Sequence, residues 1–205
     1  MVERVLILFA IACSLNIGTI LAQPSLNGST GLFEVPTADI VRNDNVSIGA
    51  YSYDNYNMKS IGVNINPKIE LTGVNIKGNG DTFNKLNIKY IIASESVLSP
   101  GYAIGINDLT SEQKFSPFFV LSKGLPLGFR IHAGVGGGSY NNGFVAIEKN
   151  ITPHMRTNLF PSTNFIVEYD GKNTNYGVRM SMAQNVKFNL GRCDNKTFIG
   201  LTYAK

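Results

Sequence analysis

One stretch decides the fold: Leu127-Gly128-Phe129-Arg130-Ile131-His132-Ala133-Gly134-Val135. Apolar residues hold every odd position and polar or small residues hold the even ones. Because successive side chains of a β-strand point to opposite faces, this stretch predicts a strand with one apolar and one polar face. The pattern recurs along the chain and predicts about twelve strands. Their ranges are 45–53, 61–66, 68–76, 86–90, 102–107, 116–122, 127–135, 143–149, 163–170, 176–182, 186–190 and 199–203.

The connections between these strands are short and polar. Asn79-Gly80, Asn142-Gly143 and Asp170-Gly171 are hairpin signals. No segment in this part of the chain has a helical period. Strands in succession without crossover helices predict an antiparallel meander. We therefore expect an all-β fold, an up-and-down β-barrel of about 10–12 strands, preceded by a signal peptide.

Composition narrows the class of protein. The chain has 205 residues, of which 43% are hydrophobic and only 16% are charged, whereas soluble domains average roughly 25% charged. The two cysteines exclude a disulfide scaffold, and the two histidines leave little for a metal centre. The net charge of +4 is spread thinly, so we expect no nucleic-acid partner. We expect no cofactor and no metal.

The N-terminus reads as a targeting segment. A short charged start precedes the mostly apolar run Val5–Ala22, and Ala22-Gln23-Pro24 offers a cleavage point after Ala22. The other interpretation is an uncleaved anchor helix, although Asn16 and Gly18 interrupt the apolar run. We therefore expect a signal peptide over 1–22, a single barrel domain over 23–205, and export to a bacterial outer membrane. Cys193 would remain as the only thiol.

The alternation of apolar and polar residues alone does not show which face of the barrel contacts water. The polar face consists of glycine, asparagine, serine and isolated charges rather than the many lysines and glutamates of a solvated exterior. Its members include Gly62, Asn64, Gly105, Gly128, Arg130, His132, Gly177, Arg179 and Gly200. This favours a polar lumen and a lipid-facing apolar belt, with Ile61, Ile104, Phe129 and Ile131 outside. The alternative is a soluble lipocalin-like carrier with an apolar cavity, which the short strands would suit.

Two segments carry a family resemblance. The first is Gly28-Ser29-Thr30-Gly31-Leu32-Phe33-Glu34-Val35-Pro36-Thr37-Ala38, and the second is Val167-Glu168-Tyr169-Asp170-Gly171-Lys172-Asn173-Thr174-Asn175-Tyr176-Gly177-Val178-Arg179. Both are similar to segments of the YjbH-type family of bacterial outer-membrane proteins, with Phe33 where isoleucine is usual. The resemblance implies an outer-membrane β-barrel linked to exopolysaccharide production or export. It implies lipid, polysaccharide and export-machinery proteins as partners, and it carries over no catalytic residue.

Charges on the polar face suggest a lumen cluster made of Arg130, Glu168, Asp170 and Arg179. We expect Glu168 and Asp170 to pair with Arg179 across the hairpin around Asp170-Gly171. Four bases, including Lys89 and Lys187, against these two acids would leave the lumen positive. Two outcomes follow: an anion-favouring path, or a bore plugged by long side chains.

The segment before the first expected strand, here called the lead-in, also carries a structural signal. Gly31 and Pro36 predict a plug-like or rim-hugging lead-in, because proline fixes φ and cannot donate to a sheet.

His132 would be the base of an outer-membrane lipid-processing enzyme, but no serine has the context of a nucleophile. Gly134 to Gly138 lacks the lysine and helix of a phosphate loop. We therefore expect a protein that is not an enzyme.

Overall fold

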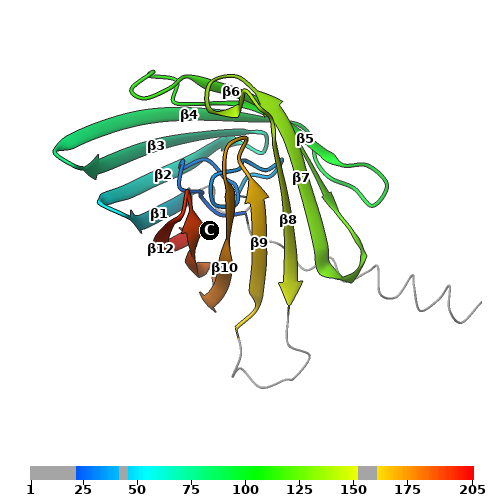
Figure 1. Ribbon diagram of the computed structural model, residues 1–205. Helices are drawn as coiled ribbons and strands as arrows, with labels where there is room; N and C mark the ends of the chain where they lie inside the picture. The colour runs from blue at the N-terminus through cyan, green and yellow to red at the C-terminus, as the bar shows by residue number, and fades with distance from the viewer. Residues whose placement is uncertain (1–21, 42–45, 152–160) are drawn as a thin grey trace, which may run out of the picture.

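The computed structural model describes residues 22–41, 46–151 and 161–205. The expected signal peptide, apart from Ala22, and the first residue of the expected strand 45–53 lie outside this part of the chain. Twelve strands form one closed barrel in the order β1-β12-β11-β10-β9-β8-β7-β6-β5-β4-β3-β2 (Figure 1). The strands are β1 (Val46–Tyr53), β2 (Tyr56–Asn66), β3 (Ile69–Gly78), β4 (Asp81–Ala93), β5 (Gly101–Asn107), β6 (Ser116–Gly124), β7 (Phe129–Gly136), β8 (Phe144–Ile151), β9 (Thr163–Tyr169), β10 (Thr174–Ala183), β11 (Val186–Cys193) and β12 (Lys196–Ala204).

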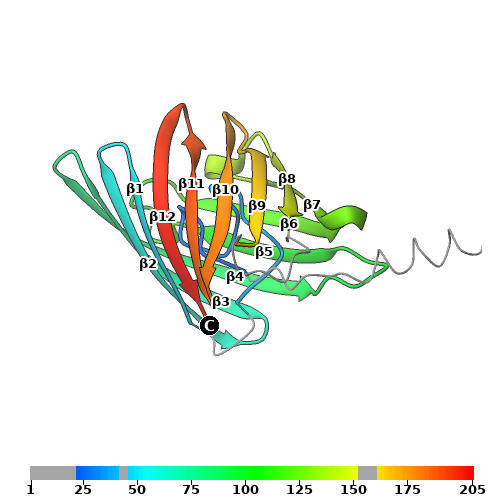
Figure 2. The same cartoon turned by 90° about the horizontal axis from the view of Figure 1, so that it is seen from below.

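Every neighbouring pair is antiparallel and consecutive, and a seam between β1 and β12 closes the barrel (Figure 2). Two short 3₁₀ turns, η1 (Pro126–Gly128) and η2 (Gly138–Tyr140), are the helical elements of the described chain. No helix among the described residues is long and apolar enough to cross a membrane. The expected all-β up-and-down barrel is confirmed, and its twelve strands lie within the expected range.

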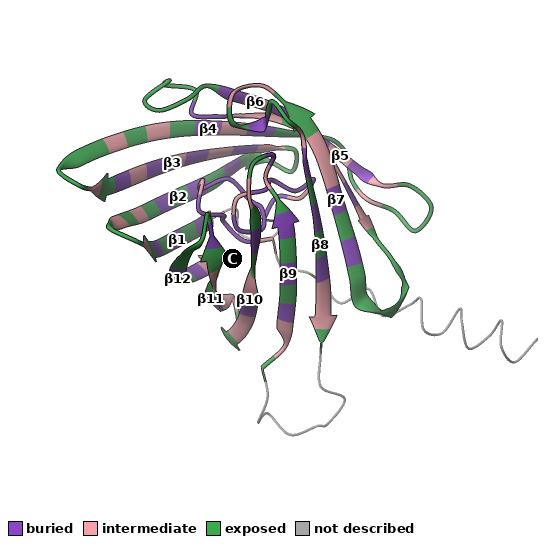
Figure 3. Ribbon diagram, in the orientation of Figure 1, coloured by how far each residue is buried: buried purple, intermediate pink, exposed green. Residues whose placement is uncertain are grey.

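Most large apolar strand residues face outward, and the charged strand residues that are buried face the lumen. Ile61, Ile104, Phe129 and Ile131 are all exposed on the outer surface. The alternating pattern is visible along the strands (Figure 3). Charged side chains fill the buried positions between them: Glu70, Lys89, Arg130, Glu148, Glu168, Arg179 and Lys187. A lipocalin-like carrier needs the opposite arrangement, so that alternative is wrong.

Several strand details differ from the sequence expectation. Within 68–76 the sequence pattern predicts a change of phase at Gly73, because apolar residues hold odd positions before it and even positions after it. The pairing of β3 with β4 runs unbroken from Ile69 to Gly78, so the strand itself does not change phase. β2 and β4 extend well beyond the ranges 61–66 and 86–90. Gly128 belongs to the η1 turn with φ of +75°, not to the lumen face. There, turn geometry overrides the alternation that the sequence pattern continues.

Glycines make room for aromatic rings inside the barrel. In four cross-strand pairs a glycine lies opposite a lumen aromatic residue: Gly105–Phe118, Gly134–Phe144, Gly191–Phe198 and Gly200–Tyr51. A Cβ at Gly200 would lie 2.1 Å from Cδ1 of Tyr51. The ring therefore occupies space that any other residue would need, which explains the glycine content of the inner face.

Candidate functional site: a plug inside the barrel

Residues 22–41, here called the plug, lie inside the barrel and fill its lumen (Figure 1). Their apolar side chains Leu26, Leu32, Phe33 and Val35 are buried. The ring of Phe33 packs edge-on against that of Phe198, with 4.7 Å between centroids. The plug folds back on itself through short bridges, Pro24 with Thr30 and Gly31 with Pro36. The expected plug-like lead-in is thus a compact insert.

The mouth-side segment of the plug, Gly31–Val35, is held by one acid and one base. The carboxylate of Glu168 accepts backbone N–H bonds from Phe33 (3.1 Å), Glu34 (2.6 Å) and Val35 (3.4 Å). The guanidinium of Arg179 donates to the carbonyls of Gly31 (3.1 Å) and Leu32 (2.8 Å). Charged groups therefore satisfy backbone groups that no strand pairs.

Two asparagines orient these charges. The Asn175 amide donates to Glu168 Oε1 at 3.2 Å. Asn189 Oδ1 accepts from Arg179 Nε at 2.7 Å. Each charged side chain is thereby fixed from the wall side while its free end contacts the plug. The arrangement holds the plug by its backbone.

A second buried pair holds the middle of the plug. Lys89 Nζ lies 3.6 Å from Glu70 Oε1. Glu70 accepts from the backbone N–H of Thr30 (2.8 Å) and from its hydroxyl, while Lys89 donates to the Thr30 carbonyl at 2.7 Å. One residue thus has both backbone groups and its side chain bound by strands β3 and β4.

The base segment of the plug, Ala38–Val41, is held at the end of the barrel where β1 begins. Arg130 Nη1 and Nη2 donate to the two oxygens of Asp39 at 2.6 and 2.8 Å. Arg130 also pairs with Glu95 at 2.9 Å, and Asn64 donates to the Val41 carbonyl. Burial alone would raise the pKa of Asp39, but the guanidinium of Arg130 outweighs it and lowers that pKa to about 2. This pair therefore stays ionised over the ordinary pH range.

Next to the base segment the fold brings together a serine, a histidine and a glutamate. Ser122 Oγ lies 2.7 Å from His132 Nδ1, and His132 Nε2 lies 3.4 Å from Glu148 Oε1. All three side chains are buried, and Ser122 Oγ accepts from the backbone N–H of Ala38 at 2.8 Å. The sequence pattern missed this grouping because Glu148 lies on another strand. With its oxygen bonded to the plug and shielded from solvent, Ser122 serves here to hold the plug.

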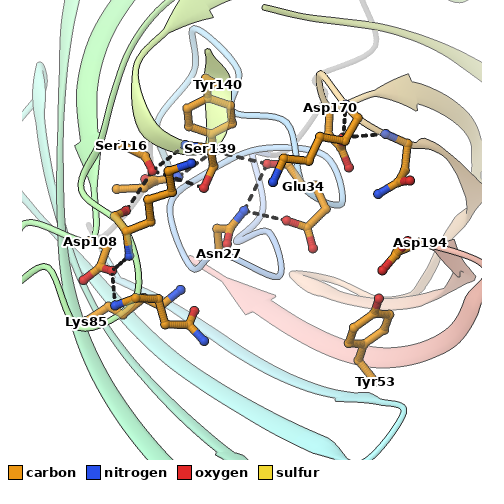
Figure 4. Close-up of a pocket in the computed structure, with 15 residues that line it drawn as sticks. Asn27, Glu34, Tyr53, Lys85, Asp108, Ser116, Ser139, Tyr140, Asp170 and Asp194 are labelled. Atoms are coloured by element: carbon orange, nitrogen blue, oxygen red, sulfur yellow. Dashed lines mark hydrogen bonds between the residues drawn. The ribbon is translucent and has the colours of Figure 1, made fainter. Parts of the chain in front are cut away.

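A cavity of about 270 Å³, here called the mouth cavity, opens at the opposite end of the barrel (Figure 4). Asn27 and Glu34 of the plug form part of its lining, together with Lys85, Tyr140 and Asp170. Burial raises the pKa of Glu34 to about 8, and the carboxylates of Glu168 and Asp170 add to the effect. Asn27 donates to Glu34 Oε2 at 2.7 Å. Glu34 therefore carries a proton at neutral pH.

Two other acids of the mouth cavity, Asp108 and Asp170, accept hydrogen bonds from loop backbone. Asp108 accepts from the N–H groups of Glu112, Gln113 and Lys114. Although burial works the other way, these bonds lower the pKa of Asp108. In the described residues no carboxylate lies within ion-pair distance of Lys85, Lys114 or Lys172, which also line the cavity. The mouth thus offers ammonium, amide and hydroxyl groups.

These features invite comparison with known proteins. The family model described as "Exopolysaccharide biosynthesis protein YbjH" matches residues 25–163. The chain belongs to this family. Its YjbH-type barrel also resembles a solved "KdgM porin" and a "KdgM porin in complex with disordered oligogalacturonate". Each has a TM-score of 0.50 and 10% identity, over 78% of this chain and 98% of the other.

A third solved structure, "NanC porin structure in rhombohedral crystal form", has a TM-score of 0.46 and 7% identity, over 78% of this chain and 99% of the other. No curated protein matches the sequence. At these identities the likeness concerns the fold, which is that of outer-membrane porins. The YjbH-type resemblance read from the sequence is confirmed.

The YjbH-type barrel places the four expected cluster residues apart. Arg130 lies at the base segment, Glu168 and Arg179 lie at the mouth-side segment, and Asp170 lies in the β9–β10 turn. The expected pairing of Arg179 with Glu168 or Asp170 is wrong. The register sets Arg179 opposite Asn164 and sets Glu168 opposite Asn175, too far along the hairpin for contact.

The expected excess of lumen bases is also wrong. Glu70 and Glu148 are buried wall acids, and the plug adds Glu34 and Asp39. Glu70 was hidden by the expected phase change in its strand, whereas the plug acids lie outside any alternating pattern. No group of three or more histidine, cysteine or acidic residues within the described ranges could hold a metal ion.

Proposed function

We propose that this protein is a non-enzymatic, saccharide-conducting channel of the bacterial outer membrane that serves exopolysaccharide biogenesis or export. In the resting state its own N-terminal plug closes it. We further propose that a signal peptide is cleaved after Ala22, so that residues 23–205 form the mature barrel. Polysaccharide, outer-membrane lipid and export-machinery proteins are the partners that follow.

The lining of the lumen carries the proposal. Six buried asparagines project inward from six different strands: Asn64, Asn87, Asn107, Asn164, Asn175 and Asn189. A carboxamide both donates and accepts hydrogen bonds, as sugar hydroxyls do. Removing the plug would expose these amides to water, together with the lumen aromatic residues Tyr51, Phe118, Phe144 and Phe198. A wall needed only to hold a permanent core would be expected to be apolar.

The bonds to the plug support its release. Glu168, Arg179, Glu70 and Lys89 contact mainly its backbone. Water or sugar hydroxyls can replace such contacts without leaving an unpaired charge in an apolar site. In the open state we propose that Arg130, Glu168 and Arg179 line the path, with Asp170 at its mouth.

Sugar entry into proteoliposomes tests the proposal. The wild-type protein should admit little neutral di- or trisaccharide and should show rare, brief openings in planar bilayers. A Glu168→Gln/Arg179→Gln double variant loses both charges that hold the mouth-side segment, so it should admit sugar and show longer openings. A steady open channel in the wild type would contradict closure by the plug.

A matched control removes the same two charges elsewhere. Glu112 and Arg192 are exposed, and the Arg192 guanidinium donates to the carbonyl of Asn195. The Glu112→Gln/Arg192→Gln variant should behave as the wild type. Plug exposure can be scored by a glutamate-specific protease, because Glu34 is the only glutamate in residues 22–41. A folded variant with an accessible Glu34 that admits no sugar would contradict a channel.

A further inference from the structure

The barrel wall is uneven in height. β2, β3 and β4 have 11, 10 and 13 residues, whereas β5, β7, β8 and β9 have 7, 8, 8 and 7. A tilted strand needs about 9–11 residues to cross the hydrocarbon core of a bilayer. The β3–β4 hairpin accordingly extends beyond its neighbours (Figure 1). On the other side β5, β7, β8 and β9 are shorter than this length, and β6, with 9 residues, just reaches it.

The turns beside the short strands are apolar. Four residues, here called the turn patch, protrude at the end where β7 begins: Val97, Leu98, Leu125 and Leu127. Val97 is 75% exposed, Leu98 94% and Leu127 69%. Next to the long strands the turns are polar, with Pro67-Lys68 at the same end and Asn79-Gly80 at the other. The apolar turns of this end therefore lie directly before the short strands β5 and β7.

Hydrogen bonds fix the turn patch in place. The Ser96 N–H donates to the Ser99 carbonyl at 3.0 Å, which closes a tight turn with Val97 and Leu98 at its tip. Lys123 Nζ donates to the carbonyls of Ser96 (2.7 Å) and Val97 (2.8 Å). Leu127 has a φ of +65°, a conformation rare for leucine. These backbone contacts therefore hold the apolar side chains on the outer surface.

The turn patch continues the apolar outer surface. Along β7, Ile131 and Phe129 point outward, and Leu127 follows them past the end of the strand. Lys149 Nζ lies 4.2 Å from the ring centroid of Phe129 and donates to the Leu127 carbonyl. Lysines beside an apolar rim suit the headgroup boundary of a bilayer. Because the turn patch continues the lipid-facing surface, membrane lipid is the partner that it would contact.

We infer that the turn patch inserts into the lipid of the surrounding membrane and completes the apolar belt where the strands are too short to span. It would also anchor one side of the barrel against tilting. The inference needs only that the barrel lies in a membrane. It does not depend on sugar passage.

The chain contains no tryptophan, so a single introduced tryptophan is a unique fluorescent probe. Leu98→Trp tests the patch, and Leu127→Trp is a second probe of it. Ile131→Trp, on the outer face of β7, marks the membrane interior. Thr82→Trp marks water, because Thr82 pairs with Lys77 at the exposed tip of the β3–β4 hairpin. All four side chains are on the outside, and heat-modifiable gel migration confirms folding.

In bilayers containing brominated phospholipid, lipid bromines should quench the fluorescence of Leu98→Trp and Leu127→Trp at least half as strongly as that of Ile131→Trp. Aqueous acrylamide should quench the fluorescence of both patch probes weakly. The fluorescence of Thr82→Trp should be quenched strongly by acrylamide and weakly by the lipid bromines. If both patch probes match Thr82→Trp, the inference is wrong and the patch faces water. Sugar-entry assays on the same proteoliposomes report independently on the channel.

Discussion

The mouth-side segment and the base segment belong to one plug, yet the wall holds them by different means. At the base, opposite charges meet: Arg130 forms a two-pronged ion pair with Asp39 and a further pair with Glu95. At the mouth, Glu168 binds backbone N–H groups, and the neighbouring Glu34 adds a second carboxyl group. The base is stabilised by attraction, whereas the mouth tolerates like charges only while one of them is protonated.

This difference assigns separate roles to the two ends. The low pKa of Asp39 keeps the base closed through the neutral range, and the raised pKa of Glu34 makes the mouth sensitive within it. The mouth-side segment also borders the mouth cavity, where a solute would arrive (Figure 4). We therefore expect release to begin at the mouth and to be limited by the base.

Replacing Arg130 should have the largest effect. Arg130→Gln removes the cation that pairs with Asp39 and lies beside Glu148, and it leaves Glu95 with Lys123 as its ion-pair partner. The loss should weaken plug closure by about 3 kcal/mol, near the lower limit for a buried pair because Asp39 is partly exposed. That corresponds to roughly a hundredfold increase in the open fraction. Cleavage after Glu34 by a glutamate-specific protease measures it.

Arg192→Gln is the matched control for this variant, and its cleavage rate should equal that of the wild type. If Arg130→Gln leaves the protease resistance of Glu34 unchanged while the barrel stays folded, the base segment does not limit release.

Replacing Glu168 should have an intermediate effect. Glu168→Gln keeps the shape but presents one neutral oxygen to three N–H groups, so we expect a loss of about 2 kcal/mol, typical of bonds to a charged acceptor. The same protease assay applies, with Glu112→Gln as control. A change larger than that of Arg130→Gln would reverse the ranking of the two ends.

The smallest effect, taken over one pH unit, should come from the titration of Glu34. Its folded pKa of about 8 lies above the ordinary value, so its contribution to closure is complete below about pH 4.5 and is lost as the pH rises through 8. Channel opening should therefore increase by up to about tenfold per pH unit between about pH 5 and 8. Conductance at stepped pH measures this.

Glu34→Gln stays neutral and cannot titrate, so its opening probability should not vary over this pH range. A pH response that persists in Glu34→Gln would assign the effect to another group, and Lys85, Tyr140 and Asp170 face the same cavity.

The barrel itself could be predicted from the sequence because alternation is a local signal. Each strand sequence shows an apolar and a polar face, and the many glycine, asparagine and serine residues on the polar face indicated which side meets lipid. Strand ends were harder to place. The residues 56–60 and 81–85 extend β2 and β4 past their apolar cores, and only pairing with a neighbour makes them strands.

The site could be predicted only in part. Gly31 and Pro36 indicated a lead-in within or beside the bore, and Arg130, Glu168 and Arg179 were expected to face the lumen, where the structure places them. Their partners could not be read, because Glu168 and Arg179 bind backbone atoms, which leave no mark on the sequence. Asp39 and Arg130 are separated by 91 residues, so only the closed barrel brings them together.

The plug also has a consequence for the order of folding. The seam joins the first and last strands, and closing so long a loop carries a large entropic cost that slows β-rich folding. The plug precedes all twelve strands in the chain, and it bonds to β3, β4, β7, β9 and β10. A segment that contacts strands on both sides of the seam acts as an internal template. It shortens the effective search before β1 and β12 meet, so the residues that close the channel would also help to assemble it.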